Sequence, residues 1–276
     1  MTTSWNYVVG YRRISRRIIL RSCRSPFKLS LKYHSIIRNA SESCNATMEY
    51  KLIGPEHYKQ VLEHLRKSFF ADEPLNKAAG LCQNGCSNPE LEDHCLEALQ
   101  DRMSLMAVDG KAAQEGKCKI AGVVLNGILR SGDTAKALEK LEESCDADFR
   151  KIFELLHRHN LKNNLFEHFN VDAMFDVRIL SVDSGYRGQG IANELVRQSL
   201  AVAKKNGFRL LKADATGIFS QKIFRSHGFE VFAEQPYDKY TDADGKIILP
   251  VEAPHIKLQL LYKRICNEDK NREQAQ

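Results

Sequence analysis

Residues 179–192 read ILSVDSGYRGQGIA and join an apolar, strand-like segment to a glycine-rich basic turn and then to an amphipathic helix. Gly188 and Gly190 allow the backbone of the turn to approach a ligand closely, because neither residue carries a Cβ atom. The helix that begins near Ile191 directs the unpaired N–H groups of its first turn at the same point, where their partial positive charge attracts an anion. This stretch therefore predicts a site for a pyrophosphate.

The spacing of the turn excludes two other phosphate-binding motifs. A dinucleotide-binding unit has the pattern G-x-G-x-x-G near the start of a βαβ unit, and a Walker loop reads G-x-x-x-x-G-K-[ST]. Here the pattern is Arg187-x-x-Gly190-x-Ala192, in the middle of the chain. Such a short pattern also fits an ordinary turn between a strand and a helix, so its interpretation depends on the flanking segments.

The flanking segments follow a regular order of elements. Apolar and charged residues alternate from Phe175 to Ile179, as in a half-buried strand, but Leu180 then follows Ile179 directly, which is compatible with a β-bulge. The elements expected downstream are a helix that starts near Ile191 and ends at Asn206-Gly207, a strand near 209–214, and a helix near 217–227 that ends at His227-Gly228-Phe229.

Together these motifs resemble the coenzyme A site of the GCN5-related N-acetyltransferase (GNAT) superfamily. The resemblance implies an α/β fold, whose central mixed, mostly antiparallel sheet is flanked by helices and split at a bulged strand. It implies acetyl-CoA as co-substrate, with a backbone N–H of Leu180 or Val182 available to stabilise an oxyanion. The coenzyme-binding residues that it implies are Leu180, Ser181, Val182, Arg187, Gly188, Gln189, Gly190, Ile191, Ala192 and Ser220.

Three further segments narrow the resemblance. Residues 68–76 read SFFADEPLN, residues 124–127 read VLNG, and residues 253–255 read APH. With the ILSVD segment, they are similar to the insect arylalkylamine N-acetyltransferases, of which dopamine N-acetyltransferase is the familiar member, over residues 49–264. The resemblance implies acetyl transfer to small amines such as dopamine, serotonin, octopamine or tyramine.

The resemblance places the general base on Glu73. An alkylamine is protonated at neutral pH, as Lys is with a pKa of ~10.4, so a base must remove the proton before the nitrogen can attack. Burial beside Phe69, Phe70 and Pro74 is expected to raise the pKa of the Glu73 carboxylate, and these side chains with Asp72 are expected to bind the amine. The alternative is that both acids are solvated loop residues.

The general acid is less clearly marked. Many superfamily members have a Tyr where this chain has Phe224, which cannot donate a proton. The insect enzymes instead have two Ser residues, which fall on Thr216 and Ser220, and Ser220 is the better candidate for a hydrogen bond to the coenzyme sulfur. Thr216 fits a helix N-cap equally well. His255 is expected either to line the amine pocket and relay a proton or to be structural.

The ends of the chain differ from its middle. The first 41 residues contain seven Arg and two Lys but no Asp or Glu; since the whole chain carries +6, the remaining 235 residues carry −3. The basic balance therefore does not indicate a nucleic-acid partner. We expect residues 1–47 to be a basic extension, either disordered or a mitochondrial targeting peptide, with Met48 as an alternative start. Residues 48–266 are the expected N-acetyltransferase domain and 267–276 a polar tail.

The remaining expectations concern compartment, metals and substrate range. The eight cysteines are scattered and predict free thiols; Cys82, Cys86, His94 and Cys95 match no zinc spacing, so no metal is predicted. No apolar stretch approaches 18 residues, so we expect no membrane span. We also expect a monomer, located in the cytoplasm or, if the basic extension is translated, in the mitochondrion. Residues 132–170 are expected to cover the acceptor site. Open alternatives are aliphatic amines (a polyamine or agmatine), a longer acyl-CoA, a non-catalytic coenzyme A-binding protein, and a protein acetyltransferase.

Overall fold

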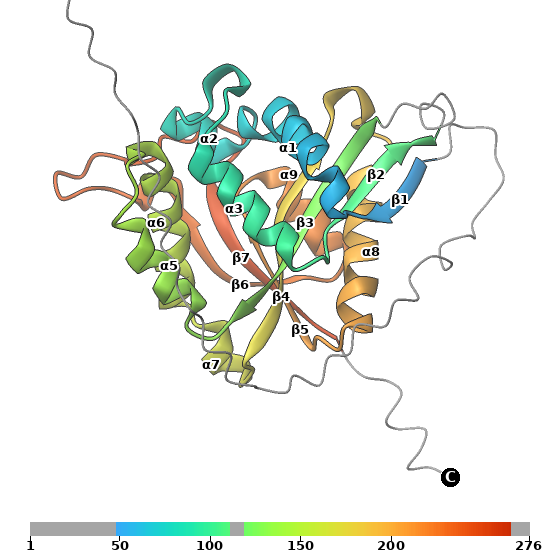
Figure 1. The fold of residues 1–276 in the computed structure, drawn as a ribbon. Coiled ribbons are helices and arrows are strands. Elements are labelled where there is room, and N and C mark those ends of the chain that lie inside the picture. The colour runs from blue at the N-terminus through green and yellow to red at the C-terminus, as the bar shows by residue number, and fades with distance from the viewer. Residues whose placement is uncertain (1–47, 111–118, 266–276) are drawn as a thin grey trace, which may run out of the picture. The chain divides into compact units, whose positions relative to one another are not determined.

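The computed structural model describes residues 48–110 and 119–265, and the predictions for residues 1–47 and 267–276 lie outside these ranges. The described part contains one seven-stranded sheet in the order β1-β2-β3-β4-β5-β7-β6, in which only the β4–β5 pair is parallel. The predicted mixed, mostly antiparallel sheet is therefore confirmed (Figure 1). The strands are β1 (Met48–Leu52), β2 (Leu105–Asp109), β3 (Ile120–Arg130), β4 (Ala173–Val182), β5 (Leu210–Ala215), β6 (Glu230–Pro236) and β7 (Lys257–Arg264).

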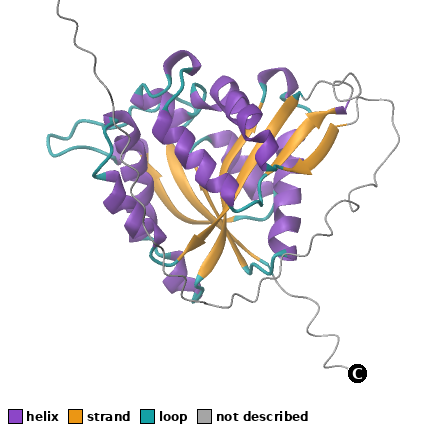
Figure 2. Cartoon of the chain, in the orientation of Figure 1, coloured by secondary structure: helices purple, strands orange, loops and turns teal. Residues whose placement is uncertain are grey.

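Helices cover both faces of the sheet (Figure 2). On one face, the helices that follow β1 and the first two helices between β3 and β4 share one apolar cluster, and on the other face α8 and α9 share a second one. The helices are α1 (Tyr58–Leu65), α2 (Pro74–Ala79), α3 (Pro89–Gln100), α5 (Asp133–Leu141), α6 (Ala147–Lys162), α7 (Leu165–Phe169), α8 (Ile191–Lys205) and α9 (Ile218–Ser226).

The predicted amphipathic helix after the glycine turn is α8. Its Ile191, Leu195 and Val196 are buried against Phe175 and Val177 of β4, as their helical spacing requires. The helix ends at the residues expected from the sequence, because the glycine that follows its last turn adopts a φ of +78°. This packing fixes the start of α8 at the end of β4.

A β-bulge interrupts β4 at Arg178. On β3, Leu125 pairs with Ile179 and its neighbour Asn126 pairs with Val177, so Arg178 has no partner residue. Val177 lies in the cluster under α8, whereas Ile179 lies in the opposite cluster, so the bulge reverses the side to which the following residues point. The broken alternation in the sequence therefore marks a real bulge, located just before the Ile179-Leu180 pair.

The sheet splits at the bulge, where β4 and β5 stop pairing. The parallel pairing of β4 with β5 covers only residues 175–177 on β4 and 211–213 on β5, although both strands continue. Asp183 donates its backbone N–H to Ala121 on β3. Successive residues of an antiparallel strand point their N–H groups to opposite sides. The N–H groups of Leu180 and Val182 therefore face the opening between β4 and β5.

No helix in residues 48–110 and 119–265 is both long and apolar enough to cross a membrane.

Candidate active site

A cavity of about 1290 Å³ occupies the split in the sheet and extends to α6. It reaches from the turn before α8 to residues of α3, α5 and α6, so the predicted coenzyme and acceptor regions belong to one continuous space. Most of the predicted site residues line it: Phe69, Asp72, Glu73, Pro74, Leu180, Ser181, Val182, Arg187, Gly188, Gly190, Ile191, Ala192, Thr216, Ser220 and His255. Two of the predicted residues, Phe70 and Gln189, are not among the residues that line it.

Phe70 does not have the predicted contact with an amine. Its side chain is 0% exposed and packs in the apolar cluster beneath α1 and α3, whereas Phe69 faces the cavity. Consecutive residues in a helical turn point in different directions, so only one ring of the Phe69-Phe70 pair can line the site. The expectation that both rings form the amine pocket is wrong for Phe70.

The turn before α8 has the conformation that the glycines predict. Gly188 and Gly190 both have a φ of +78°, and a Cβ atom built on either would meet no protein atom within 4 Å. Gly190 is the N-cap of α8, so the first N–H groups of the helix point out of its end beside the cavity. Both glycines line the cavity and leave open space beside the turn, so the turn forms a backbone cradle that fits a diphosphate.

Ser181 is turned away from the cradle. Its hydroxyl forms a hydrogen bond with His64 Nε2 at 3.0 Å, and both side chains are buried. Burial lowers the pKa of His64 to about 4, so the imidazole is neutral near pH 7. A ligand in the cavity could therefore contact Ser181 only through its backbone.

Glu73 lies at the end of an unusual helical turn. Residues Arg66–Phe70 form a π-helical turn after α1, and the backbone N–H of Glu73 donates to Phe69 O. Glu73 then serves as the N-cap of α2, with Oε2 accepting from the Asn76 N–H at 2.7 Å. Its other oxygen, Oε1, accepts from the Thr216 hydroxyl at 2.7 Å. The carboxylate is therefore held at two points.

The surroundings of Glu73 change its acidity. Burial raises the pKa of Glu73 above its ordinary value, while hydrogen bonds from the Thr216 hydroxyl and from the backbone of Asn76 and Leu75 act in the opposite direction. Asp72, in contrast, is exposed and pairs with Arg187 at 2.8 Å between its Oδ2 and the guanidinium. The two adjacent acids thus have different environments, and only Asp72 is a solvated loop residue.

Thr216 is not a helix N-cap. The N-cap of α9 is Gly217, and the Thr216 hydroxyl is used on Glu73 instead. The N-cap alternative for Thr216 is therefore wrong. Ser220 also faces the cavity, but its hydroxyl donates to Gly217 O at 2.9 Å. The nearby Phe224 is buried against Phe229.

His255 lies on the cavity and also holds a backbone group in place. It lines the cavity, and its Nδ1 accepts the backbone N–H of Ile218 at 3.2 Å, in the first turn of α9. Burial and the nearby Lys77 lower its pKa, so the ring is neutral near pH 7 with its proton on Nε2. A Cβ atom at Gly217 would lie 3.0 Å from His255 Nδ1 and 3.3 Å from Pro74 Cγ, so this glycine allows the three segments to meet.

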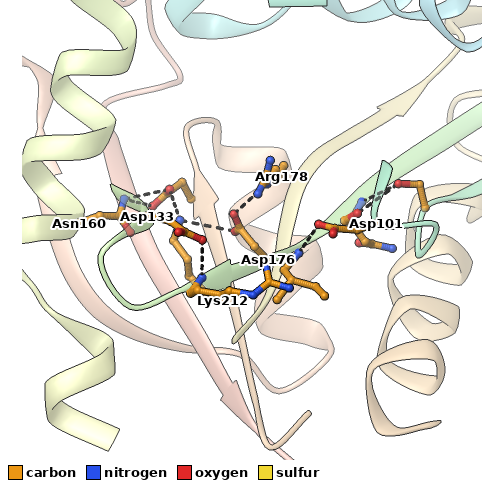
Figure 3. A network of polar contacts seen from close by, with 11 residues as sticks. Asp101, Asp133, Asn160, Asp176, Arg178 and Lys212 are labelled. Carbon is orange, nitrogen blue, oxygen red and sulfur yellow. Dashed lines mark hydrogen bonds and ion pairs between the residues drawn. The ribbon is translucent and has the colours of Figure 1, made fainter. Parts of the chain in front are cut away.

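A group of polar and charged residues that the sequence did not reveal lines the cavity, and Figure 3 shows several of their contacts. Lys212 Nζ lies 2.7 Å from Asp214 Oδ2 and 3.5 Å from Asp176 Oδ1, and Arg178 Nε donates to Asp176 Oδ2 at 3.2 Å. Asn160 of α6 donates to both oxygens of Asp214. We call these five residues the charge cluster. The signal in the sequence that could have revealed the cluster was a pair of opposite charges, two positions apart, on each of two neighbouring strands.

Comparison with known proteins identifies the family. The family model described as Acetyltransferase (GNAT) family matches residues 173–229. The crystal structure of arylalkylamine N-acetyltransferase 2 from Aedes aegypti is 46% identical, with a TM-score of 0.75 over 79% of this chain and 99% of that chain. The chain belongs to the GNAT acetyltransferase family. The predicted family, fold and enzyme class are thereby confirmed, and membership of this family implies acetyl-CoA.

Two more distant structures share the fold of this GNAT acetyltransferase. Mosquito arylalkylamine N-acetyltransferase like 5b is 20% identical, with a TM-score of 0.71 over 79% of this chain and 100% of that chain. Drosophila melanogaster polyamine N acetyltransferase is 19% identical, with a TM-score of 0.70 over the same shares. At these identities the likeness concerns the fold alone.

The described residues contain no group of three or more His, Cys, Asp and Glu side chains arranged to hold a metal ion. Cys82, Cys86 and Cys95 are free thiols, and burial raises the pKa of Cys82 to about 11.

Proposed function

We propose that this protein transfers the acetyl group of acetyl-CoA to a small arylalkylamine, with Glu73 as the general base. The observation that carries the proposal is the position of Glu73, a half-buried acid with a raised pKa in the cavity that joins the backbone cradle to an aromatic-lined space. The 46% identity to a mosquito protein described as an arylalkylamine N-acetyltransferase supports the choice of acceptor.

The chain's own residues have distinct roles in this proposal. The raised pKa of Glu73 brings the carboxylate closer to the range in which a base accepts a proton efficiently at neutral pH. Phe69 and Pro74 line the cavity beside it and would shield it from water. His255 lines the same cavity, and its Nε2, which Ile218 does not contact, would serve as a second proton carrier. Ser220 would donate to the departing sulfur after rotating away from Gly217 O.

The residues of the cradle fit the coenzyme. Gly188, Gly190 and the first turn of α8 would hold the pyrophosphate, and the inward N–H groups of Leu180 and Val182 would bind the pantetheine arm and the acetyl oxygen. Bound acetyl-CoA supplies the activated acyl group. The side chain of Gln189 and that of Ser181 have no direct role in this proposal.

Replacing Thr216 tests the coupling between the hydroxyl and the base. Thr216→Val removes a hydrogen bond that favours the charged carboxylate, so the pKa of Glu73 should rise and the acidic limb of the kcat/KM profile should move to higher pH by about one unit. Thr216→Ser keeps the hydroxyl and should retain the parental limb. A pH profile of Thr216→Val that superimposes on the parental one would show that the hydroxyl does not tune the base.

The function itself is tested by a thiol-release assay. Purified protein is assayed with acetyl-CoA and a longer acyl-CoA against tyramine, dopamine, serotonin, agmatine, a polyamine and a peptide. We expect acetyl-CoA with the aromatic amines to give the highest kcat/KM. Turnover of only the aliphatic amines or the peptide would reject the proposed acceptor class, and coenzyme binding without any turnover would reject catalysis.

A further inference from the structure

We propose that the charge cluster recognises hydroxyl groups at the ring end of the acceptor amine. This inference rests on the proposed function, because it assigns the far end of the molecule whose nitrogen lies at Glu73. The cluster consists of Asp176, Arg178, Lys212, Asp214 and Asn160, and all five residues line the cavity. Four of them are labelled in Figure 3.

The position of the cluster along β5 supports this assignment. Lys212, Asp214 and Thr216 are alternate residues and all face the cavity, while Leu211, Ala213 and Ala215 are buried under α8 and α9. Two residues of a strand span about 6.6 Å, so Asp214 lies about that far along the backbone from Thr216, which holds Glu73. A two-carbon arm with an aromatic ring is long enough to extend from Glu73 to the cluster.

The wall between these two polar ends suits an aromatic ring. Ile152, Phe153 and Leu156 line the cavity on α6, the helix that also carries Asn160 of the cluster, and the ring of His94 packs against Phe153 edge to face at 4.7 Å. Burial lowers the pKa of His94 to about 3 and that of His157 to about 4, so both rings are neutral at pH 7. The wall is therefore apolar or aromatic and carries no charge.

The charge balance of the cluster selects a neutral polar group over a second cation. Asp176 contacts both Arg178 and Lys212, and Asp214 contacts Lys212, so two acids face two bases. The pKa of Lys212 is raised through its two acidic neighbours although burial opposes this, so it stays charged. An aliphatic diamine or agmatine would bring a second ammonium or a guanidinium into the cluster. That positive charge would then lie close to the two cations already there.

The cluster retains hydrogen-bonding capacity toward the cavity. Within the described ranges, Arg178 donates only through Nε, which leaves its Nη groups for a ligand oxygen, and Asp214 Oδ1 accepts only from Asn160. A phenolic hydroxyl both donates and accepts, so it can use a carboxylate and a guanidinium together. Asp214, Arg178 and Asn160 are only partly buried, as expected for residues that contact a ligand.

The test compares amines that differ only in ring hydroxyls. With the full chain, kcat/KM is measured for phenethylamine, tyramine and dopamine in the parent, in Asp214→Asn and in the control Glu154→Gln, which removes an exposed carboxylate on α6 paired with Arg158. We expect kcat/KM of the parent to be about tenfold higher for tyramine than for phenethylamine. In Asp214→Asn this preference should disappear because kcat/KM for tyramine falls, while that for phenethylamine stays unchanged. Glu154→Gln should behave as the parent.

Different outcomes distinguish the inference from the proposed function. Equal kcat/KM for phenethylamine and tyramine in the parent, a preference for agmatine over both, or an equal loss for both in Asp214→Asn would each overturn the inference while arylalkylamine transfer stands. No turnover of any aromatic amine would overturn the proposed function. Because Asp214→Asn can fail to fold, calorimetry on the parent with N-acetyltyramine and N-acetylphenethylamine is the second measurement, and equal affinities would overturn the inference.

Discussion

Glu73→Gln is expected to lower kcat by about 10²- to 10⁴-fold while leaving the Kd for acetyl-CoA within about threefold. The amide is close to the carboxylate in shape and can still accept from the Asn76 N–H, so the N-cap of α2 is preserved. It cannot take a proton from an ammonium at neutral pH. Steady-state kinetics with tyramine and calorimetry with acetyl-CoA give the two numbers.

A matched variant separates the base from a general effect of charge. Glu252→Gln removes an exposed carboxylate that pairs with Lys77 of α2, on the same helix that Glu73 caps. It should keep the parental kcat. Equal kcat for Glu73→Gln and the parent would remove Glu73 from the mechanism. Recovery of Glu73→Gln activity at higher pH would support the role of the base, because solvent then deprotonates the amine.

Gly190→Val is expected to weaken coenzyme A binding by about 10- to 100-fold, since one or two charge-assisted hydrogen bonds from the cradle would be lost. The side chain would enter the cradle at the N-terminus of α8, and a valine at a φ of +78° also strains the turn. Calorimetry with free coenzyme A measures the loss without requiring turnover.

The control for this variant lies at the other end of the same helix. Gly207 has the same φ of +78° and equally open surroundings, so Gly207→Val introduces a similar backbone strain far from the cradle. Both variants should lower the melting temperature by similar amounts, but Gly207→Val should bind coenzyme A as the parent does. If both variants lost affinity equally, strain rather than the cradle would explain the effect.

The fold and the coenzyme cradle were predictable because local patterns encode them. Alternation along β4, its break beside Arg178 and the glycines around α8 each constrain the backbone at one place in the chain, and the structure has the bulge and the turn there. The family resemblance then placed Glu73, Thr216 and His255 on one cavity, and they do lie there.

The contacts across the cavity were not predictable in the same way. Asp176 and Arg178 fit a strand with one solvated face, but in the structure Asp176 is buried and Arg178 is partly buried in the cavity that α6 also lines. The pairing of Asp176 with Lys212 depends on the parallel register of β4 and β5, which no local pattern fixes. Likewise, adjacent aromatic residues do not reveal that Phe70 points into the core.

The close approach at Gly217 has a consequence for redesigning this enzyme. A methyl group there would lie against His255 and Pro74, the residue next to Glu73, so even alanine would require these side chains to shift by a few tenths of an ångström. Engineers who wish to widen the range of accepted amines should therefore vary the α6 side, around Phe153 and His157, and leave this junction untouched.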